Sequence, residues 1–336
     1  MGKIVPKRKY IVGAYATSPN LFSWNEKSEY LYYERLKNIH SIRGLELPFW
    51  GDSLHPFDDE WLLSNLNPVW QNILTCVPGT MKLLESNPWF GIASKDEKSR
   101  KLAIEFYRRA FDSINLLKKR IGQKSIIGIA LTSSPFNYGD MNYADNECFM
   151  DSLIEIISWN WGDVNLYVEH CDAETTQNTK PKKGFLSIED EIEIIGKVNN
   201  KMKSNIGMII NWGRSVIEGR DINVPIHHIQ NLNRNKILTG LMFSGTTNKN
   251  DNLYGAWSDL HMPPTSSQGF KYFEPQSLMS YENIRDTLKV CDIQSLGLIG
   301  IKLLSLPESV NINRRIGVNK DTMKLLNKAL NELYLA

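Results

Sequence analysis

Eight short runs of β-branched and apolar residues alternate with longer amphipathic stretches along the chain. This alternation is typical of parallel strands joined by crossover helices. The predicted strands are Tyr10–Ala16, Ile42–Glu46, Asn72–Val77, Ser125–Thr132, Val164–His170, Ile206–Asn211, Leu238–Ser244 and Leu296–Leu303. The predicted helices are Glu29–Ile39, Asp58–Leu66, Asp96–Ile121, Asn146–Trp159, Ile188–Met202, Pro225–Asn233, Tyr281–Val290 and Lys320–Leu333.

Eight strand–helix pairs are the number that closes a (β/α)8 TIM barrel. A chain of 336 residues lies within the size range of such barrels. We therefore predict an α/β protein with one (β/α)8 barrel domain over residues 1–336. A doubly wound open sheet is the alternative, but it normally has a glycine-rich phosphate loop after the first strand. The sequence at that position, which begins at Ala14, reads Ala-Tyr-Ala-Thr-Ser-Pro.

The charge balance restricts the partners of this chain. Lys and Arg number 39 and Asp and Glu number 37, which gives a formal net charge of +2. Such a balance provides no electrostatic reason to bind nucleic acid or an anionic membrane. No apolar run approaches the roughly 20 residues of a membrane span, and the four cysteines form no CxxC pair. We expect a cytoplasmic protein with a small-molecule partner.

Glycines in five strands indicate which side chains point inward. A crowded barrel interior favours small residues in its lower layer, and strand side chains alternate between the two faces. The glycines of this phase are Gly44, Gly128, Gly207, Gly240 and Gly300. Counting in twos toward the carboxyl ends predicts inward side chains for Glu46, Thr132, Asn211, Ser244 and Lys302. In the fifth strand, placing Leu166 and Val168 toward the helices turns Glu169 inward.

Three of these predicted inward residues are charged: Glu46, Glu169 and Lys302. An unpaired charge inside a barrel costs several kcal/mol unless it is partnered or used. These residues therefore form either a structural ion-pair network or a functional site. Their convergence on the carboxyl-terminal face, where barrel enzymes hold their sites, favours function.

The connection Gly245–Ser280, between the seventh strand and its helix, is much longer than is usual in α/β units. It contains Tyr254, Trp257 and His261, and the apolar run that begins at Met262. We predict a lid-like loop that folds over the barrel mouth and brings His261 or Trp257 to the site. The alternative is that this loop forms the contact of a homo-oligomer.

Four sequence stretches resemble a known superfamily. They are Val-Gly-Ala-Tyr-Ala from Val12, Gly-Leu-Glu-Leu-Pro-Phe-Trp-Gly from Gly44, Val-Glu-His-Cys-Asp from Val168 and Ile-Asn-Trp-Gly-Arg-Ser from Ile210. These stretches are similar to those of the xylose isomerase-like TIM barrels, and within them to an uncharacterised bacterial family. The superfamily includes sugar isomerases, epimerases and AP-endonuclease-like hydrolases. The resemblance runs almost the full length and implies carbohydrate metabolism, without an established activity for this family.

The resemblance also implies a metal site, which this sequence does not reproduce. The usual ligands are a Glu, an Asp, a His and a final Glu on successive later strands. Glu169 matches the first, Asn211 offers a neutral amide in the second place, and Lys302 replaces the last carboxylate. His261 has an unusual spacing for the third. The cofactor is therefore none or a divalent metal, the latter in a shifted site of Glu169, His261 and either Asp172 or the neighbouring His170.

The leading functional prediction is a sugar or sugar-acid isomerase or epimerase that transfers a proton beside a carbonyl. Glu169 and Glu46 serve as base and acid, and Lys302 as the electrophile that stabilises the enediolate. Arg214 is placed to clamp a substrate carboxylate or phosphate. The remaining predicted contacts to a sugar-like substrate are the polar side chains of Asn211, Ser244 and His261 and the aromatic faces of Trp50, Trp212 and Trp257.

Three other functions remain open on the sequence. Glu46 and Glu169 are a carboxylate pair of the kind that glycoside hydrolases use. Lys302 is a candidate Schiff-base nucleophile of an aldolase-like enzyme. The departure from the metal pattern also fits a homologue that binds a sugar without catalysis.

Overall fold

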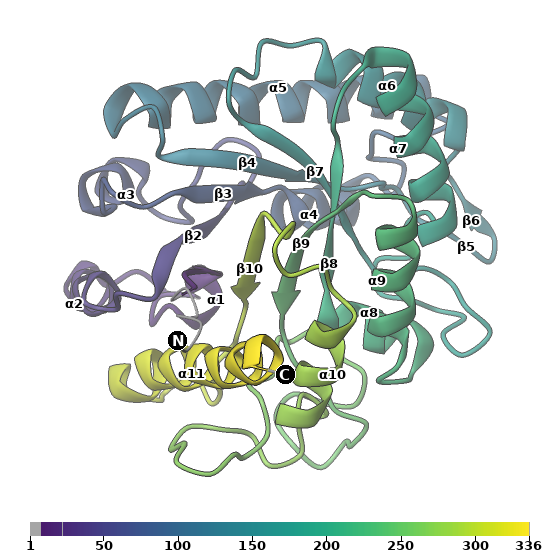
Figure 1. Ribbon diagram of the computed structural model, residues 1–336. Helices are drawn as coiled ribbons and strands as arrows, with labels where there is room; N and C mark the ends of the chain where they lie inside the picture. The colour runs from purple at the N-terminus through teal and green to yellow at the C-terminus, as the bar shows by residue number, and fades with distance from the viewer. Residues whose placement is uncertain (1–7, 22, 336) are drawn as a thin grey trace.

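The computed structural model describes residues 8–21 and 23–335. Eight parallel strands form a closed barrel in the order β1-β10-β9-β8-β7-β4-β3-β2, which confirms the predicted TIM barrel (Figure 1). The strands are β1 (Tyr10–Val12), β2 (Ile42–Pro48), β3 (Asn72–Thr75), β4 (Ile126–Leu131), β7 (Asn165–His170), β8 (Gly207–Asn211), β9 (Leu238–Phe243) and β10 (Leu298–Ile301). A two-stranded hairpin of β5 (Asn137–Tyr138) and β6 (Met141–Asn142) lies outside the barrel sheet.

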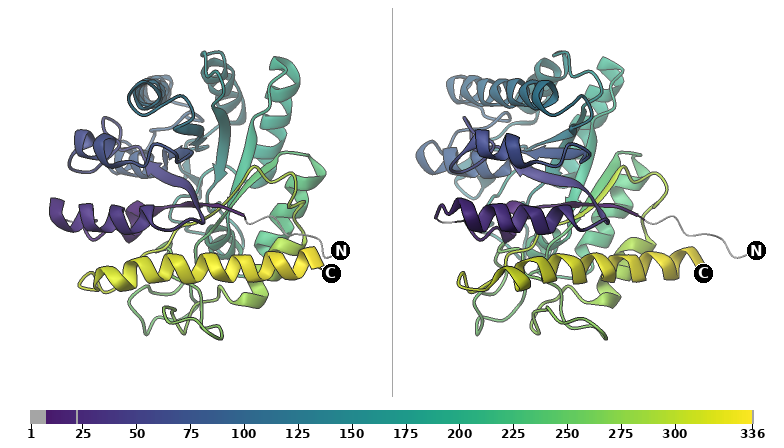
Figure 2. Two further views of the ribbon diagram at one scale, coloured as in Figure 1. Left: turned by 60° about the vertical axis from the view of Figure 1, so that its left-hand side comes forward. Right: turned by 90° about the vertical axis from the view of Figure 1, so that its left-hand side faces the viewer.

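Helices surround the barrel. They are α1 (Ala14–Thr17), α2 (Glu26–Lys37), α3 (Asp59–Asn65), α4 (Val77–Ser86), α5 (Glu97–Arg120), α6 (Asn146–Ile157), α7 (Ile188–Met202), α8 (Trp212–Gly219), α9 (Val224–Arg234), α10 (Tyr281–Lys289) and α11 (Ile312–Leu335). The last helix, α11, packs beside α2 and so closes the helical ring (Figure 2). Each of the eight predicted helices corresponds to one of these, with boundaries shifted by a few residues; α11 begins eight residues earlier than predicted.

Three short helices that directly follow strands correct the sequence prediction. The first strand ends at Val12 and α1 begins at Ala14, whereas the strand was predicted to continue to residue 16. Val77 was assigned to the third strand but begins α4, where Pro78 fits because the first helical turn needs no N–H donor there. Helix α8 follows β8 without a loop. Apolar residues occur on both sides of each of these three boundaries, so the hydrophobic pattern does not mark where the strand ends.

The barrel interior and the layer between barrel and helices form separate cores. The interior core consists of Ile11, Ile73, Ala130, Tyr167, Ile209, Met242 and Leu298. Side chains alternate along a strand, so every second residue after these core positions also points into the barrel. This count places four residues inward at the carboxyl ends, as predicted: Glu169, Asn211, Ser244 and Lys302. Thr132 does not join them, because its Oγ1 lies 3.4 Å from the hydroxyl of Tyr107 on α5 and its backbone N–H donates to the same hydroxyl at 3.1 Å.

Candidate active site

Lys302 lies between the two predicted carboxylates at the barrel mouth. Its Nζ is 2.9 Å from Glu46 Oε2 and 3.9 Å from Glu169 Oε1. All three side chains are 0–1% exposed. The ammonium and the Glu46 oxygen are close enough to form an ion pair, although they lack the alignment of a hydrogen bond. The three residues assigned to catalysis from the sequence are thus in one buried group.

Arg214 adds a second cation to this group. It lies in the first turn of α8, and its Nη1 donates to Glu169 Oε1 at 2.5 Å. Its Nε donates to Asp259 Oδ2 at 3.1 Å. Because α8 begins at the end of β8, its first turn lies at the carboxyl-terminal face of the barrel. The guanidinium is only 2% exposed, so Arg214 belongs to the mouth and not to the surface.

Asp259 comes from the long β9–α10 connection and was not predicted as a site residue. Its carboxylate contacts Lys183, which lies 3.8 Å from Asp172, and His261 Nδ1 at 3.2 Å. The connection therefore covers the mouth and brings His261 to the site. Trp257 has a different neighbour, because its ring lies 5.2 Å from the guanidinium of Arg220.

The predicted substrate-binding residues divide between the mouth and the helix layer. Ser244 Oγ donates to Asn211 Oδ1 at 2.6 Å, and the buried amide nitrogen of Asn211 has no hydrogen-bond partner among the described residues. Trp50 lines a narrow cavity of about 20 Å³ beside Glu46. Trp212 instead donates from Nε1 to Thr287 on α10 at 3.0 Å. Trp212 is therefore part of the core, because the first residue of α8 turns toward the neighbouring helix.

Tyr15 and Gly13 complete the surroundings of Lys302. The Lys302 Nζ lies 5.7 Å from the centre of the Tyr15 ring. A Cβ on Gly13 would lie 2.9 Å from Lys302 Cγ and 3.1 Å from Glu46 Oε2, so only glycine leaves room for this ion pair. Neither residue was assigned a role from the sequence. Ile11 on β1 points into the barrel, so Gly13, two residues later, lies on the same inward side. Strand alternation in β1 would therefore have indicated Gly13.

The environment moves the pKa values of the two carboxylates in opposite directions. Burial raises the pKa of Glu46 more than the Lys302 ammonium lowers it. Burial also acts to raise the pKa of Glu169, but Arg214 and Lys302 together lower it below its ordinary value. Two neighbouring carboxyl groups whose pKa values are shifted in opposite directions are the usual arrangement of a catalytic acid and base.

Lys302 stays protonated despite its burial. Desolvation acts to lower its pKa, but Glu46, Tyr15 and Glu169 outweigh it and raise the pKa above the ordinary value. A charged ammonium can stabilise a developing oxyanion.

The residues at the mouth do not fit a divalent metal ion. The Glu169 carboxylate is already engaged by Arg214 and Lys302, and Asp172 pairs with Lys183. His170 faces away from the mouth, toward Glu191 and Glu218. The shifted ligand set considered from the sequence is therefore not assembled. In the described part of the chain, only His170, Glu218 and His228 bring three metal-ligating atoms within 4.8 Å of one another.

No helix in the described part of the chain is long and apolar enough to cross a membrane.

Solved structures share this fold at low sequence identity. The IolI protein, crystallised with a zinc atom, is 13% identical with a TM-score of 0.56, over 95% of this chain and 99% of that one. D-psicose 3-epimerase, crystallised in the presence of D-fructose, is 13% identical with a TM-score of 0.55, over 97% and 99% of the two chains. A xylose isomerase domain protein is among the other structural neighbours. The xylose isomerase-like barrel fold is confirmed.

Sequence comparison identifies the family. The uncharacterized protein STM3670 of Salmonella typhimurium (strain LT2) is 38% identical over 321 residues, which cover 95% of this chain and 97% of that protein. The family described as "Domain of unknown function (DUF4862)" matches residues 11–318, from within β1 to within α11. That match includes every residue of the charged group at the barrel mouth. The chain belongs to the DUF4862 family.

Proposed function

We propose that this protein is a sugar or sugar-acid isomerase or epimerase that moves a proton beside a carbonyl at the barrel mouth. The observation that carries the proposal is the pair of buried carboxylates, Glu46 and Glu169, on either side of one ammonium. Such a reaction needs a base, an acid and a group that stabilises the enediolate. The structural neighbours that act on sugars support the same class of reaction.

The pKa directions suggest which carboxylate carries the proton. Glu46, with its raised pKa, is the acid that donates a proton to the substrate. Glu169 stays ionised and acts as the base, and its second oxygen accepts from Thr75 Oγ1 at 3.3 Å. Lys302 stabilises the negative charge that develops on the carbonyl oxygen.

Arg214 links substrate binding to the strength of the base. In the structure it donates to Glu169, which weakens that carboxylate as a base. A substrate carboxylate or phosphate would compete with Glu169 for the planar guanidinium, the side chain best suited to such anions. Binding of an anionic sugar would thereby raise the basicity of Glu169 at the moment it is needed.

Access of a substrate requires the β9–α10 connection to move. Asp259 contacts both Lys183 and Arg214, and the charged group beneath it is nearly inaccessible to solvent. Opening of this segment would free Arg214 for the substrate, and closure would exclude water from the enediolate. The Schiff-base alternative is less well supported, since it requires a neutral Lys302 amine and the surrounding carboxylates keep it charged.

Proton exchange with solvent tests this proposal before the natural substrate is known. A panel of aldoses, ketoses, sugar acids and their phosphates is incubated with the protein in D2O, and deuterium incorporation beside the carbonyl is followed by NMR. We expect exchange with at least one compound, and a loss of about 10²–10³ in its rate in Lys302→Met. The variants Glu46→Gln and Glu169→Gln should also lose exchange.

Glu193→Gln is the matched control, because Glu193 lies on the exposed surface of α7. It should exchange at the wild-type rate. Undiminished exchange in Glu46→Gln and Glu169→Gln would refute the site. Calorimetric binding of a sugar without exchange would show a binding protein in place of an enzyme. An adduct trapped on Lys302 by borohydride would move the protein to the Schiff-base class.

A further inference from the structure

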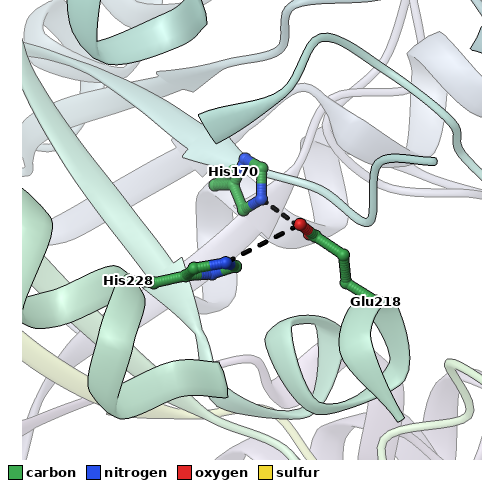
Figure 3. A group of neighbouring side chains, drawn as sticks. All are labelled: His170, Glu218 and His228. Atoms are coloured by element: carbon green, nitrogen blue, oxygen red, sulfur yellow. Dashed lines mark hydrogen bonds and ion pairs between the residues drawn. The ribbon is translucent and has the colours of Figure 1, made fainter. Parts of the chain in front are cut away.

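A second polar cluster lies outside the barrel, behind strand β7. Glu169 and His170 are neighbours in this strand, so their side chains point to opposite faces. His170 Nε2 is 2.8 Å from Glu218 Oε2, and His228 Nε2 is 3.7 Å from Glu218 Oε1. Figure 3 shows both imidazole rings facing this one carboxylate. The cluster joins β7 to helices α8 and α9 in the buried layer.

The second nitrogen of each imidazole is held by a residue outside this trio. His170 Nδ1 is 2.6 Å from Glu191 Oε2 on α7, and His228 Nδ1 is 3.0 Å from Ser215 Oγ on α8. Histidine ligands in metal sites almost always hydrogen-bond to such a partner through the nitrogen that does not bind the metal. This cluster has both the candidate ligand atoms and the outer partners that orient them.

The distances suit a small tetrahedral ion. Bonds of about 2.0–2.1 Å to zinc place tetrahedral ligand atoms roughly 3.4 Å apart. The His170 and His228 Nε2 atoms lie 2.8 Å and 3.7 Å from the two different oxygens of Glu218, and the candidate ligand atoms all lie within 4.8 Å of one another. Side-chain rotations that draw both imidazole nitrogens toward one carboxylate oxygen would bring the three ligand atoms to tetrahedral spacing.

Charge balance also favours a divalent cation here. Glu191 and Glu218 are both buried, and their ion-pair partners among the described residues are the imidazoles of His170 and His228. Buried carboxylates are stable when they are paired with a cation or coordinate a metal. A divalent ion bound by two neutral imidazoles would balance both carboxylates.

We propose that His170, His228 and Glu218 bind one zinc-type divalent transition-metal ion behind strand β7. Two imidazole nitrogens and a carboxylate oxygen are a donor set that zinc accepts, with water or the second oxygen of Glu218 as the fourth ligand. This site is separate from the barrel mouth and does not depend on the proposed activity.

The position of this ion would couple it to the mouth. His170 directly follows Glu169, and Glu218 lies one helical turn beyond Arg214 on α8. The ion would therefore fix the end of β7 relative to α8, and with them the Glu169–Arg214 pair. Its role would be to position these groups and not to contact the substrate.

Zinc binding to the full chain tests the proposal. The protein is treated with EDTA, dialysed and titrated with Zn²⁺ by calorimetry, and the bound metal is measured by elemental analysis. The absorption spectrum of the Co²⁺-loaded protein reports tetrahedral coordination. We expect one equivalent of Zn²⁺ and an increase in melting temperature. His228→Gln and Glu218→Gln should each weaken binding by more than about 100-fold, beyond the loss typical of an outer-partner change.

Two control variants separate this site from other sites on the chain. His227→Gln changes the exposed neighbour of His228 on the same helix and should bind Zn²⁺ as the wild type does. Glu169→Gln removes the carboxylate of the barrel mouth and should also retain the ion. Loss of binding in Glu169→Gln with retention in His228→Gln would place the metal at the mouth and overturn the proposal. Absence of stoichiometric binding to the folded wild type would overturn it as well.

Discussion

The substitution Lys302→Met removes the ammonium from the barrel mouth while keeping most of the side-chain volume. Glu169 retains its hydrogen bond to Arg214, whereas Glu46 loses its only ion-pair partner among the described residues. The electrostatic penalty therefore falls on Glu46, which is 1% exposed. The size of this penalty depends on whether Glu46 takes up a proton.

The free energy of unfolding of this variant should fall as the pH rises. Burial already raises the pKa of Glu46 in the wild type, and loss of the ammonium raises it further. A raised carboxyl pKa means that the folded state binds the proton more tightly, so stability is lost above the unfolded-state pKa of about 4.3. The loss is about 1.4 kcal/mol per pH unit. It is limited to about 3–5 kcal/mol, the cost of one uncompensated buried charge.

The expected destabilisation relative to wild type is therefore small at pH 5, since the pKa of Glu46 is raised in both proteins, and about 3–5 kcal/mol at pH 8. Lys302 itself does not titrate in this window, because its own raised pKa keeps it charged in the folded wild type. Urea unfolding of both proteins at the two pH values measures the difference. The double variant Glu46→Gln/Lys302→Met should recover stability at pH 8. A destabilisation that is independent of pH, or a double variant as unstable as the single one, would refute the reasoning.

Two further substitutions test the packing and the loop. Gly13→Ala places a methyl group 2.9 Å from Lys302 Cγ at a position whose φ of −72° suits alanine, so steric displacement is the expected effect. It should cost about 1–3 kcal/mol in thermal unfolding and reduce deuterium exchange; unchanged values would contradict the close packing. In Asp259, burial acts to raise the pKa, but Lys183 and Arg214 hold it well below its usual range. Its stabilising contribution is thus present above about pH 3.9 and lost as the pH falls through the folded-state pKa. Asp259→Asn should destabilise the protein by about 3 kcal/mol at pH 7 and by clearly less at pH 3, and equal losses at both would contradict this role.

The sequence predicted the parts of the site that lie on strands or directly after them. Strand alternation is a local rule, so one residue of known direction fixes the others in its strand. This rule placed Glu46, Glu169 and Lys302 in the interior, and the structure brings them together. The rule fails at Thr132, which contacts the hydroxyl of Tyr107 in the helix layer.

The loop and helix contributions were less predictable, because they depend on tertiary contacts. Asp259 reaches Arg214 across 45 residues of sequence, and no periodicity indicates that pairing. Asp259 lies two residues before His261, but this proximity is weak evidence for a site residue, because many acidic loop residues are simply exposed to solvent. Trp212 was predicted to offer its aromatic face to a sugar, but helix α8, which was not predicted, turns it toward α10.

Helix α8 explains why two separate polar clusters occur on either side of one barrel wall. A Cβ on Gly213 would lie 2.5 Å from the carbonyl oxygen of Ser244, so glycine lets the start of α8 lie directly against the end of β9. This close approach holds the first turn at the mouth, where Arg214 meets Glu169. One turn later the same helix directs Glu218 to His170, the next residue of the same strand. Glu169 and His170 are thus each held by α8 from opposite faces of β7, so a displacement of α8 would disturb both clusters together.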